Sequence, residues 1–373
     1  MAPVVLLLLL GLEPIVWGKS QVACGDMTPS AASTPRPDPP YLILLQRSTT
    51  ETNTNRTPYI LANLDYIESL PFDGMVVNIP ASWDVMRGRP LAYQHIYDHW
   101  LAPLQGKFTH FTQNFVEVMI DDPGDVFDDA AWQVTVDNWR LMARAARQAG
   151  FVGIFFDNEE YTGRWLDYPE DYTNPTHTLD EYRAQTRLRG TQIMQAIVAE
   201  FPNVVFLTYH GPYVSEPKTP LSVIAGQSAA GDASDLTGAL FTGFLEGLGP
   251  QAQLIDGGEV YAYRTADDFA HSYAWRKTGL PSAATDSAFI SPADRAVWSQ
   301  RVGISYGVYN LTFPPHAPTM TPQIMRTTLE QALRHADRYV WYYTYIDNWL
   351  IPGDMPHCWF NAVEGARAAV GDP

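Results

Sequence analysis

Cysteine is scarce in this sequence, and no apolar run is long enough to cross a bilayer. Cys24 and Cys358 are the two cysteines in 373 residues, and their spacing matches no zinc-binding pattern. A framework of several disulfides is therefore excluded. A single disulfide joining the two cysteines stays open if the protein is exported.

Positive charge is also scarce. The sequence has 24 Lys and Arg against 41 Asp and Glu, which gives a net charge of −17. Proteins that bind DNA, RNA or anionic lipid surfaces neutralise phosphate with clustered Lys and Arg. We therefore expect no nucleic-acid partner.

The beginning of the chain is typical of an export signal. The apolar run 4–12 is too short for a membrane span, and residues 1–23 are interpreted as a signal peptide. Cys24 follows the expected cleavage point, so a lipid anchor on this cysteine stays open. Residues 24–40 are rich in Pro, Ser and Thr and predict a linker. We expect a secreted, periplasmic or cell-surface protein whose folded unit is 41–373.

From residue 41 onward, strand-like runs alternate with segments of helical periodicity. The predicted strands are 41–47, 74–79, 114–120, 151–157, 204–210, 253–260, 303–310 and 339–346, with 287–290 competing for the seventh place. Helices are predicted over 130–148, 178–200, 266–277 and 322–337. Eight such strands indicate an α/β fold, a single-domain (β/α)8 TIM barrel with long βα loops. A doubly wound open sheet is the rival, but no GxGxxG or Walker loop follows the first strand.

Polar residues gather where the predicted strands end, at the face where barrel enzymes carry their active sites. They are Arg47, Asn78, Asp121, Asp122, Asp157, Glu159, His210, Asp256, Glu259, Asn310 and Asp347. The predicted strand beginnings are mostly apolar. This asymmetry indicates one functional site at the carboxyl ends of the strands.

The sharpest cluster is GFVGIFFDNEEY, residues 150–161. Alternation along a strand places Asp157 and Glu159 on one face and Glu160 on the other. Two carboxylates on one face repel each other, so one pKa rises and a mixed acid–base pair results. Glu259 or Asp256 on the sixth strand is the second partner, with Glu259 preferred. The predicted catalytic residues are Asp157, Glu159 and Glu259.

Substrate contacts are predicted around this pair. His210 ends the fifth strand between the two acidic clusters, and aromatic side chains such as Trp83 offer faces on which sugar rings stack. The full set of predicted substrate-binding residues is Asn78, Trp83, Asn158, Tyr161, His210, Asp256, Asn310, Asp347 and Trp349.

In these features the chain resembles (β/α)8-barrel glycoside hydrolases. Asn158-Glu159 is similar to the Asn-Glu pair that ends strand four in one large clan, but the seventh strand here lacks that clan's nucleophilic Glu. The layout also resembles the α-galactosidase-like clan, which implies Asp157 as nucleophile or base and Glu259 as acid. Glu159 would then assist Asp157 or exchange roles with it.

Hydrolysis of a poly- or oligosaccharide by two carboxylates is thus the predicted function, with a carbohydrate substrate and no cofactor or metal. Two alternatives stay open. His210 and the same carboxylates could hold a cation in a metal-dependent hydrolase or carbohydrate deacetylase, although no HExxH occurs. A non-catalytic glycan-binding barrel would keep the aromatic side chains without needing an acid pair.

Overall fold

The computed structural model describes residues 35–47, 53–161, 165–169, 175–224, 231–311, 320–345 and 347–371. Cys24, the predicted signal peptide and most of the predicted linker lie outside these ranges, so export, the lipid anchor and the disulfide stay predictions. Within the described ranges, no helix combines the length and apolarity that a bilayer span requires.

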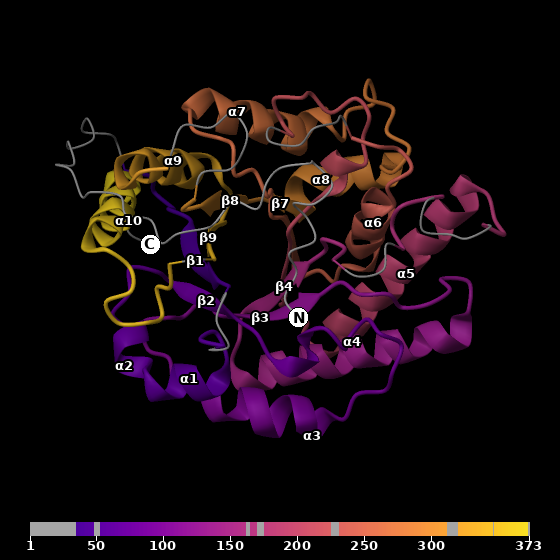
Figure 1. Cartoon of the computed structure of the whole chain (residues 1–373). Helices are drawn as coiled ribbons and strands as arrows, with labels where there is room; N and C mark the ends of the chain where they lie inside the picture. Colours follow the sequence, from indigo (N-terminus) through magenta and orange to yellow (C-terminus); the bar gives the residue numbers. More distant parts are fainter. Residues whose placement is uncertain are drawn as a thin grey trace, which may run out of the picture.

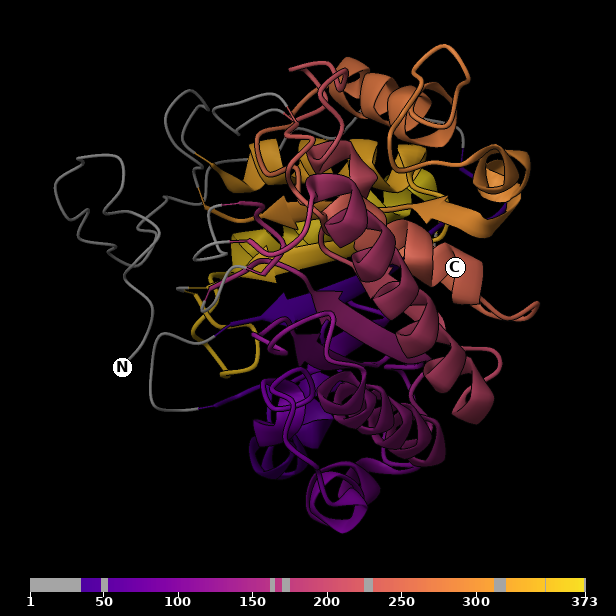
Figure 2. The same cartoon turned by 90° about the vertical axis from the view of Figure 1, so that its right-hand side faces the viewer.

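Parallel strands form a central barrel that helices surround (Figure 1). All strands point the same way, so their carboxyl ends share one face of the molecule (Figure 2). The strands are β1 (Tyr41–Gln46), β2 (Gly74–Val77), β3 (Phe115–Met119), β4 (Gly153–Asp157), β5 (Val205–Thr208), β6 (Gln253–Asp256), β7 (Val302–Ile304), β8 (Tyr306–Tyr309) and β9 (Tyr339–Thr344).

The barrel closes through the segment predicted as the seventh strand. β7 pairs with β6, β8 pairs with β9, and only Ser305 separates β7 from β8. β9 in turn pairs with β1 along its whole length. The segment 302–309 therefore joins both sides of the sheet, which confirms the (β/α)8 barrel and excludes the open doubly wound sheet.

The helices confirm the predicted alternation. α4 and α5 begin and end within two residues of the predicted ranges, and α5 starts with a capping box between Thr178 and Glu181. The helices are α1 (Thr57–Ala62), α2 (Leu64–Ile67), α3 (Tyr93–Ile96), α4 (Asp129–Ala149), α5 (Leu179–Glu200), α6 (Thr237–Gly247), α7 (Ala266–Ala274), α8 (Pro292–Arg301), α9 (Pro322–His335) and α10 (His357–Val370). Short 3-10 or π segments are η2 (Pro80–Ser82), η3 (Tyr97–Leu101), η4 (Ala102–Leu104), η5 (Pro212–Val214) and η6 (Trp275–Gly279).

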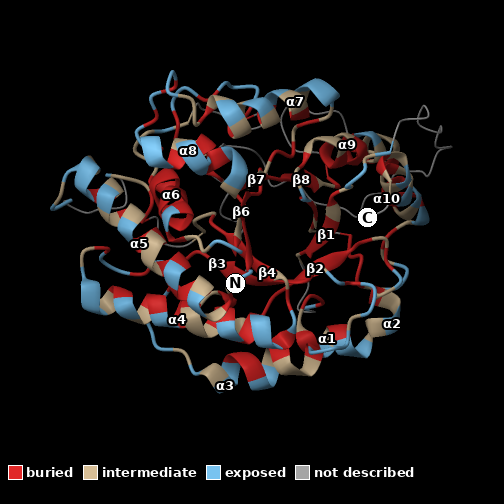
Figure 3. Ribbon diagram, turned by 180° about the vertical axis from the view of Figure 1, so that it is seen from behind, coloured by how far each residue is buried: buried red, intermediate tan, exposed pale blue. Residues whose placement is uncertain are grey.

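Alternate residues of each strand face the barrel interior or the helices, and most residues of both kinds are buried. Figure 3 shows the strands mostly in the colour of buried residues. In β4, Phe155 belongs to the inner core, whereas Ile154 and Phe156 pack against the helices. The inner core is made mainly of Ile43, Leu45, Val76, Phe115, Phe155, Val205, Leu207, Ile255, Tyr339 and Trp341. Asp157 continues the inward parity of Phe155, as the sequence predicts.

Asp256 faces outward, which corrects its prediction as a substrate-binding residue. Its neighbour Ile255 points into the barrel, so the Asp256 carboxylate points toward the helices and is fully buried. There Arg276 of η6 donates from Nε to Asp256 Oδ2 at 2.8 Å and from Nη2 to the Asp256 carbonyl at 2.7 Å. Arg276 also donates to the carbonyl of Ser305, so one arginine binds β6 to the closing segment.

Arg276→Met is expected to lower the free energy of unfolding by about 3–5 kcal/mol, because it leaves the buried Asp256 charge without a partner. Urea denaturation followed by circular dichroism measures this loss. Adding Asp256→Asn should recover part of the stability, since the unpaired charge is then gone. A single Arg276→Met variant as stable as the parent would contradict this account of barrel closure.

Candidate active site

A layer of polar side chains continues the inward-facing rows above the inner core. Arg47, which follows β1, donates to Glu117 Oε2 at 2.8 Å and to Asp157 Oδ2 at 2.7 Å. Asn78, which follows β2, donates to the same Glu117 oxygen at 2.7 Å. Glu117 and Asp157 are fully buried. The Arg47 guanidinium therefore binds two buried carboxyls beneath the mouth of the barrel.

Asp157 is held in place rather than offered to a substrate. Its Oδ1 accepts the backbone N–H of Glu159 at 3.1 Å, and its Oδ2 accepts Arg47 and, at 3.3 Å, the hydroxyl of Tyr161. Burial raises the pKa of Asp157 well above its usual value, and the nearby charges of Glu159 and Glu117 add to this despite Arg47. A fully buried carboxyl with occupied oxygens does not support its prediction as nucleophile or base; its contacts instead fix the Glu159 backbone and the Tyr161 hydroxyl.

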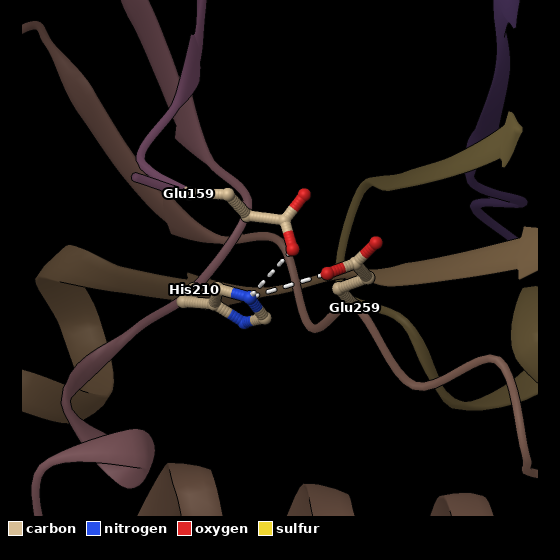
Figure 4. Close-up of side chains that lie close together, drawn as sticks. All are labelled: Glu159, His210 and Glu259. Atoms are coloured by element: carbon tan, nitrogen blue, oxygen red, sulfur yellow. Dashed lines mark ion pairs between the residues drawn. The ribbon is translucent and has the colours of Figure 1, made fainter. Parts of the chain in front are cut away.

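Three ionisable side chains from neighbouring strands meet above this layer. Glu159 follows β4, His210 follows β5 and Glu259 follows β6, and Figure 4 shows them pointing toward one another. His210 Nε2 lies 3.2 Å from Glu259 Oε2 and 3.8 Å from Glu159 Oε1. The side chain of His210 is 11% exposed, that of Glu259 14% and that of Glu159 26%, so solvent reaches all three. The structure thus brings together two of the three predicted catalytic carboxylates and His210.

The two carboxyls of this cluster differ in proton affinity. Burial acts to raise the pKa of Glu159, but hydrogen bonds with His210, Glu259 and Tyr161, together with the His210 charge, lower it to about 2. Burial and the negative charge of Glu159 raise the pKa of Glu259 to about 7, although His210 opposes this. Near neutral pH, Glu159 is ionised and Glu259 can hold a proton. The sequence predicts a mixed pair of Asp157 and Glu159, with Glu259 as the second partner; in the structure the two carboxyls whose pKa values diverge in this cluster are Glu159 and Glu259.

His210 is fixed on both its backbone and its ring. Asn158 Oδ1 accepts the His210 backbone N–H at 2.9 Å, and Asn158 Nδ2 donates to the His210 carbonyl at 3.1 Å. The ring Nδ1 lies 2.9 Å from the Tyr213 hydroxyl. Burial alone would lower the pKa of His210, but Tyr213, Glu159 and Glu259 together hold it well above its usual value. Asn158, predicted to contact substrate, is 6% exposed and instead clamps β5 to β4.

Aromatic rings flank the cluster on two sides. Trp83 lies 6.1 Å from Tyr161, ring centre to ring centre, and the Tyr161 hydroxyl donates to Glu159 Oε2 at 2.6 Å. On the other side, the Tyr343 ring lies 4.7 Å from Tyr309 and 5.6 Å from Tyr261. Trp83, Tyr161, Tyr309 and Tyr343 are partly exposed. Trp83 and Tyr161 were predicted to bind substrate, and both lie beside Glu159.

Three other predicted substrate contacts are buried in the structure. The prediction for Trp349 is wrong, because this side chain is fully buried and packs against Phe72 and Phe360 in the layer between barrel and helices. Asn310 and Asp347 are each 1% exposed, so neither presents a surface to a ligand. These residues follow the ends of strands, but a position near a strand end does not ensure that the side chain points into the mouth.

The sequence analysis assigned no role to several residues of the site. Glu117 lies in mid-strand, and its signal was a single carboxylate of the same parity as Phe115 in an otherwise apolar run. Arg47 was noted at a strand end, but its contacts on β3 and β4 are tertiary. Tyr309 and Tyr343 carried no signal that separates them from core aromatics.

The cluster also has the make-up of a cation site. One ligand atom each from Glu159, His210 and Glu259 lies within 4.8 Å of the others. Carboxylate oxygen with imidazole nitrogen suits ions such as Zn²⁺ or Mn²⁺. The residues present could therefore hold a divalent ion as well as act as an acid–base pair.

The chain matches no protein-family model and no curated protein sequence. Among solved structures, it is similar to an exo-β-1,4-mannosidase from Opitutaceae bacterium strain TAV5, with 13% identity and a TM-score of 0.51. The match covers 93% of this chain but 63% of the mannosidase, so the chain spans less than two thirds of that protein.

Two further matches are a family 5 glycoside hydrolase from Prevotella bryantii B14 and a 3-keto-D-glucoside 4-epimerase from E. coli. Their identities are 10% and 13%, and their TM-scores 0.44 and 0.45. The first match covers 88% of this chain and 95% of that one, and the second 87% and 98%. At 13% identity, the similarity to the mannosidase establishes only the fold: this chain shares the (β/α)8 barrel of that enzyme.

Proposed function

We propose that the protein is a glycoside hydrolase in which Glu259 is the general acid and Glu159 the nucleophile. The observation that carries the proposal is the Glu159–Glu259 pair, whose nearest oxygens lie within 4.8 Å of each other and whose pKa values diverge to about 2 and about 7. An ionised carboxylate opposite a protonated one, at the mouth of a (β/α)8 barrel, is the arrangement that glycosidic bond cleavage requires.

We propose a retaining mechanism, in which Glu159 attacks the substrate itself rather than through a water molecule. Retaining glycosidases hold their carboxyls about 5–5.5 Å apart, whereas inverting enzymes leave about 6.5–9.5 Å for a water molecule. Glu259 would protonate the leaving oxygen while Glu159 attacks the anomeric carbon and forms a glycosyl ester. Glu259, now ionised, would then take a proton from the water that hydrolyses this ester.

His210 is a positioning residue in this scheme. Its positive ring lies between the two carboxyls and favours the ionised form of Glu159 before the first step. The same charge stabilises Glu259 after it has released its proton. The partly exposed aromatic rings Trp83, Tyr161 and Tyr343 support a sugar as the substrate, because their faces suit the C–H edges of sugar rings.

A second candidate function follows from the same cluster. If a divalent cation binds Glu159, His210 and Glu259, the site would suit a metal-dependent hydrolase or carbohydrate deacetylase acting on sugars. A glycan-binding barrel without catalysis is the third alternative.

Glu159→Gln and Glu259→Gln are each expected to lower kcat about 10²–10⁴-fold on a cleavable glycan, because each removes one half of the acid–nucleophile pair. Hydrolysis of a polysaccharide panel, with the anomer of the first product read by NMR, measures the effect; retention is expected. Glu160→Gln is the matched control, since Glu160 accepts a backbone N–H from Leu166 rather than joining the pair. Unchanged turnover in both pair variants would refute the assignment.

Activity should fall as pH rises through about 7, because Glu259 then loses the proton that it must donate. The acid limb should lie near pH 2, where Glu159 becomes protonated, unless unfolding comes first. In His210→Gln both limbs should move to higher pH, since the His210 charge lowers the pKa of both carboxyls. A pH profile of kcat/KM tests this; limbs that do not move in the variant would contradict the role of His210.

Dialysis against EDTA is expected to leave glycan cleavage unchanged, because the proposed mechanism uses carboxyl groups alone. The assay is run on the same glycan before and after dialysis, and again after adding Zn²⁺ or Mn²⁺. Loss of activity on chelation with recovery on adding metal would favour the metal-dependent alternative.

A further inference from the structure

Arg56 lies at the barrel mouth on the side of β1 and β2. The loop that carries it is fixed to β2, because the Asn55 carbonyl accepts the backbone N–H of Asn78 at 3.0 Å. The Arg56 side chain reaches the same residue, where Nε lies 3.4 Å from Asn78 Oδ1. Asn78 in turn donates to Glu117, the carboxylate that Arg47 binds. Arg56 therefore borders the polar layer beneath the active site.

The charge of Arg56 has no carboxylate partner among the described residues. Its one hydrogen bond there is the contact with Asn78, and Glu117 acts on it as a nearby charge without a direct ion pair. Glu117 is already occupied by Arg47 and Asn78. Yet the Arg56 side chain is partly buried, and burial lowers its pKa. A partly desolvated guanidinium without a counter-ion is unfavourable unless an anion from outside completes it.

We propose that Arg56 binds the anionic group of an acidic sugar, either the carboxylate of a uronic acid or a sulfate. The proposal rests on the glycosidase function above and names its substrate class. The planar guanidinium fork matches carboxylate and sulfate oxygens in pairs, and its two terminal nitrogens make no hydrogen bond with the described residues.

Arg56 would bind this anionic group away from the cleaved bond, because several side chains separate it from Glu159. The contacts between them run from Asn78 through Glu117, Arg47 and Asp157 to Tyr161. Trp83, which like Asn78 follows β2, lies against Tyr161 and offers a ring face on this side. We expect the acidic sugar unit to occupy this side of the mouth while its neighbour reaches Glu159.

The test measures binding separately from cleavage. Glu259→Gln is titrated by calorimetry with oligosaccharide pairs that differ only in their anionic group: oligogalacturonates, sulfated galactose oligosaccharides and the neutral galactose oligomers. Binding of one anionic series is expected to exceed that of its neutral partner about tenfold or more, as for a charge-assisted hydrogen bond. Which series binds identifies carboxylate or sulfate as the group.

Arg56→Gln, made in the same Glu259→Gln protein, should remove this preference, and Arg56→Lys should keep part of it. Arg140→Gln is the matched control, because it removes the same charge from the outer surface of α4, where Arg140 pairs with Asp137. Circular dichroism verifies that each variant is folded. A preference that survives Arg56→Gln, or the absence of any preference in both anionic series, would overturn the proposal.

The two proposals fail in distinguishable ways. If the wild type cleaves neutral glycans as efficiently as acidic ones, the glycosidase function stands and the role of Arg56 is wrong. If acidic sugars bind through Arg56 but the wild type cleaves none of them, the glycosidase function fails while the anionic-sugar site stands.

Discussion

The candidate active site depends on the ion pairs that Arg47 forms beneath the barrel mouth. From its position after β1, the Arg47 guanidinium contacts two fully buried carboxyls, Glu117 and Asp157. Buried carboxyls are tolerated only where a well-placed cation and further hydrogen bonds compensate their lost hydration. Asp157, once fixed, holds the Glu159 backbone and the Tyr161 hydroxyl, and Tyr161 holds the Glu159 carboxylate. The position of Glu159 is thus fixed by its contacts with Asp157 and Tyr161.

Barrel closure supplies the second constraint. Neighbouring strands lie about 4.8 Å apart, so residues that follow three successive parallel strands are brought to one place only if each points inward. Asn158 clamps His210 to β4, and the Glu259 backbone N–H reaches the carbonyl of Tyr209 at 3.3 Å. Gly258 has φ +60, and a Cβ there would collide with Arg276. This glycine lets the chain turn after β6 so that Glu259 enters the cluster.

The sequence predicts the fold well because its signals are local. Apolar runs and helical periodicity locate the strands and helices within a few residues, and strand parity correctly predicts that Asp157 shares the inward face of Phe155. The site is predicted less completely. Contacts with Arg47 and Tyr161 give Asp157 and Glu159 different environments, and no local sequence pattern shows that Arg47 contacts residues of β3 and β4. Trp349 shows the same limit, since a residue after a strand end can still pack into the core.

The polar and aromatic residues at the barrel mouth are unevenly distributed, and under the proposed function this distribution would orient a substrate. The part of the mouth that follows β1 and β2 carries Arg56 and Trp83, and the neighbouring part, formed by β8 and β9, carries Tyr309 and Tyr343. Glu159 and Glu259 follow β4 and β6, on other strands of the same barrel. A sugar chain with a charged unit at one end of its bound segment would then fit in one direction, because reversing it would move the anion away from Arg56 and leave Arg56 unpaired. Direction of binding decides which glycosidic oxygen faces Glu259, so the residue that selects the substrate would also select the bond that is cleaved.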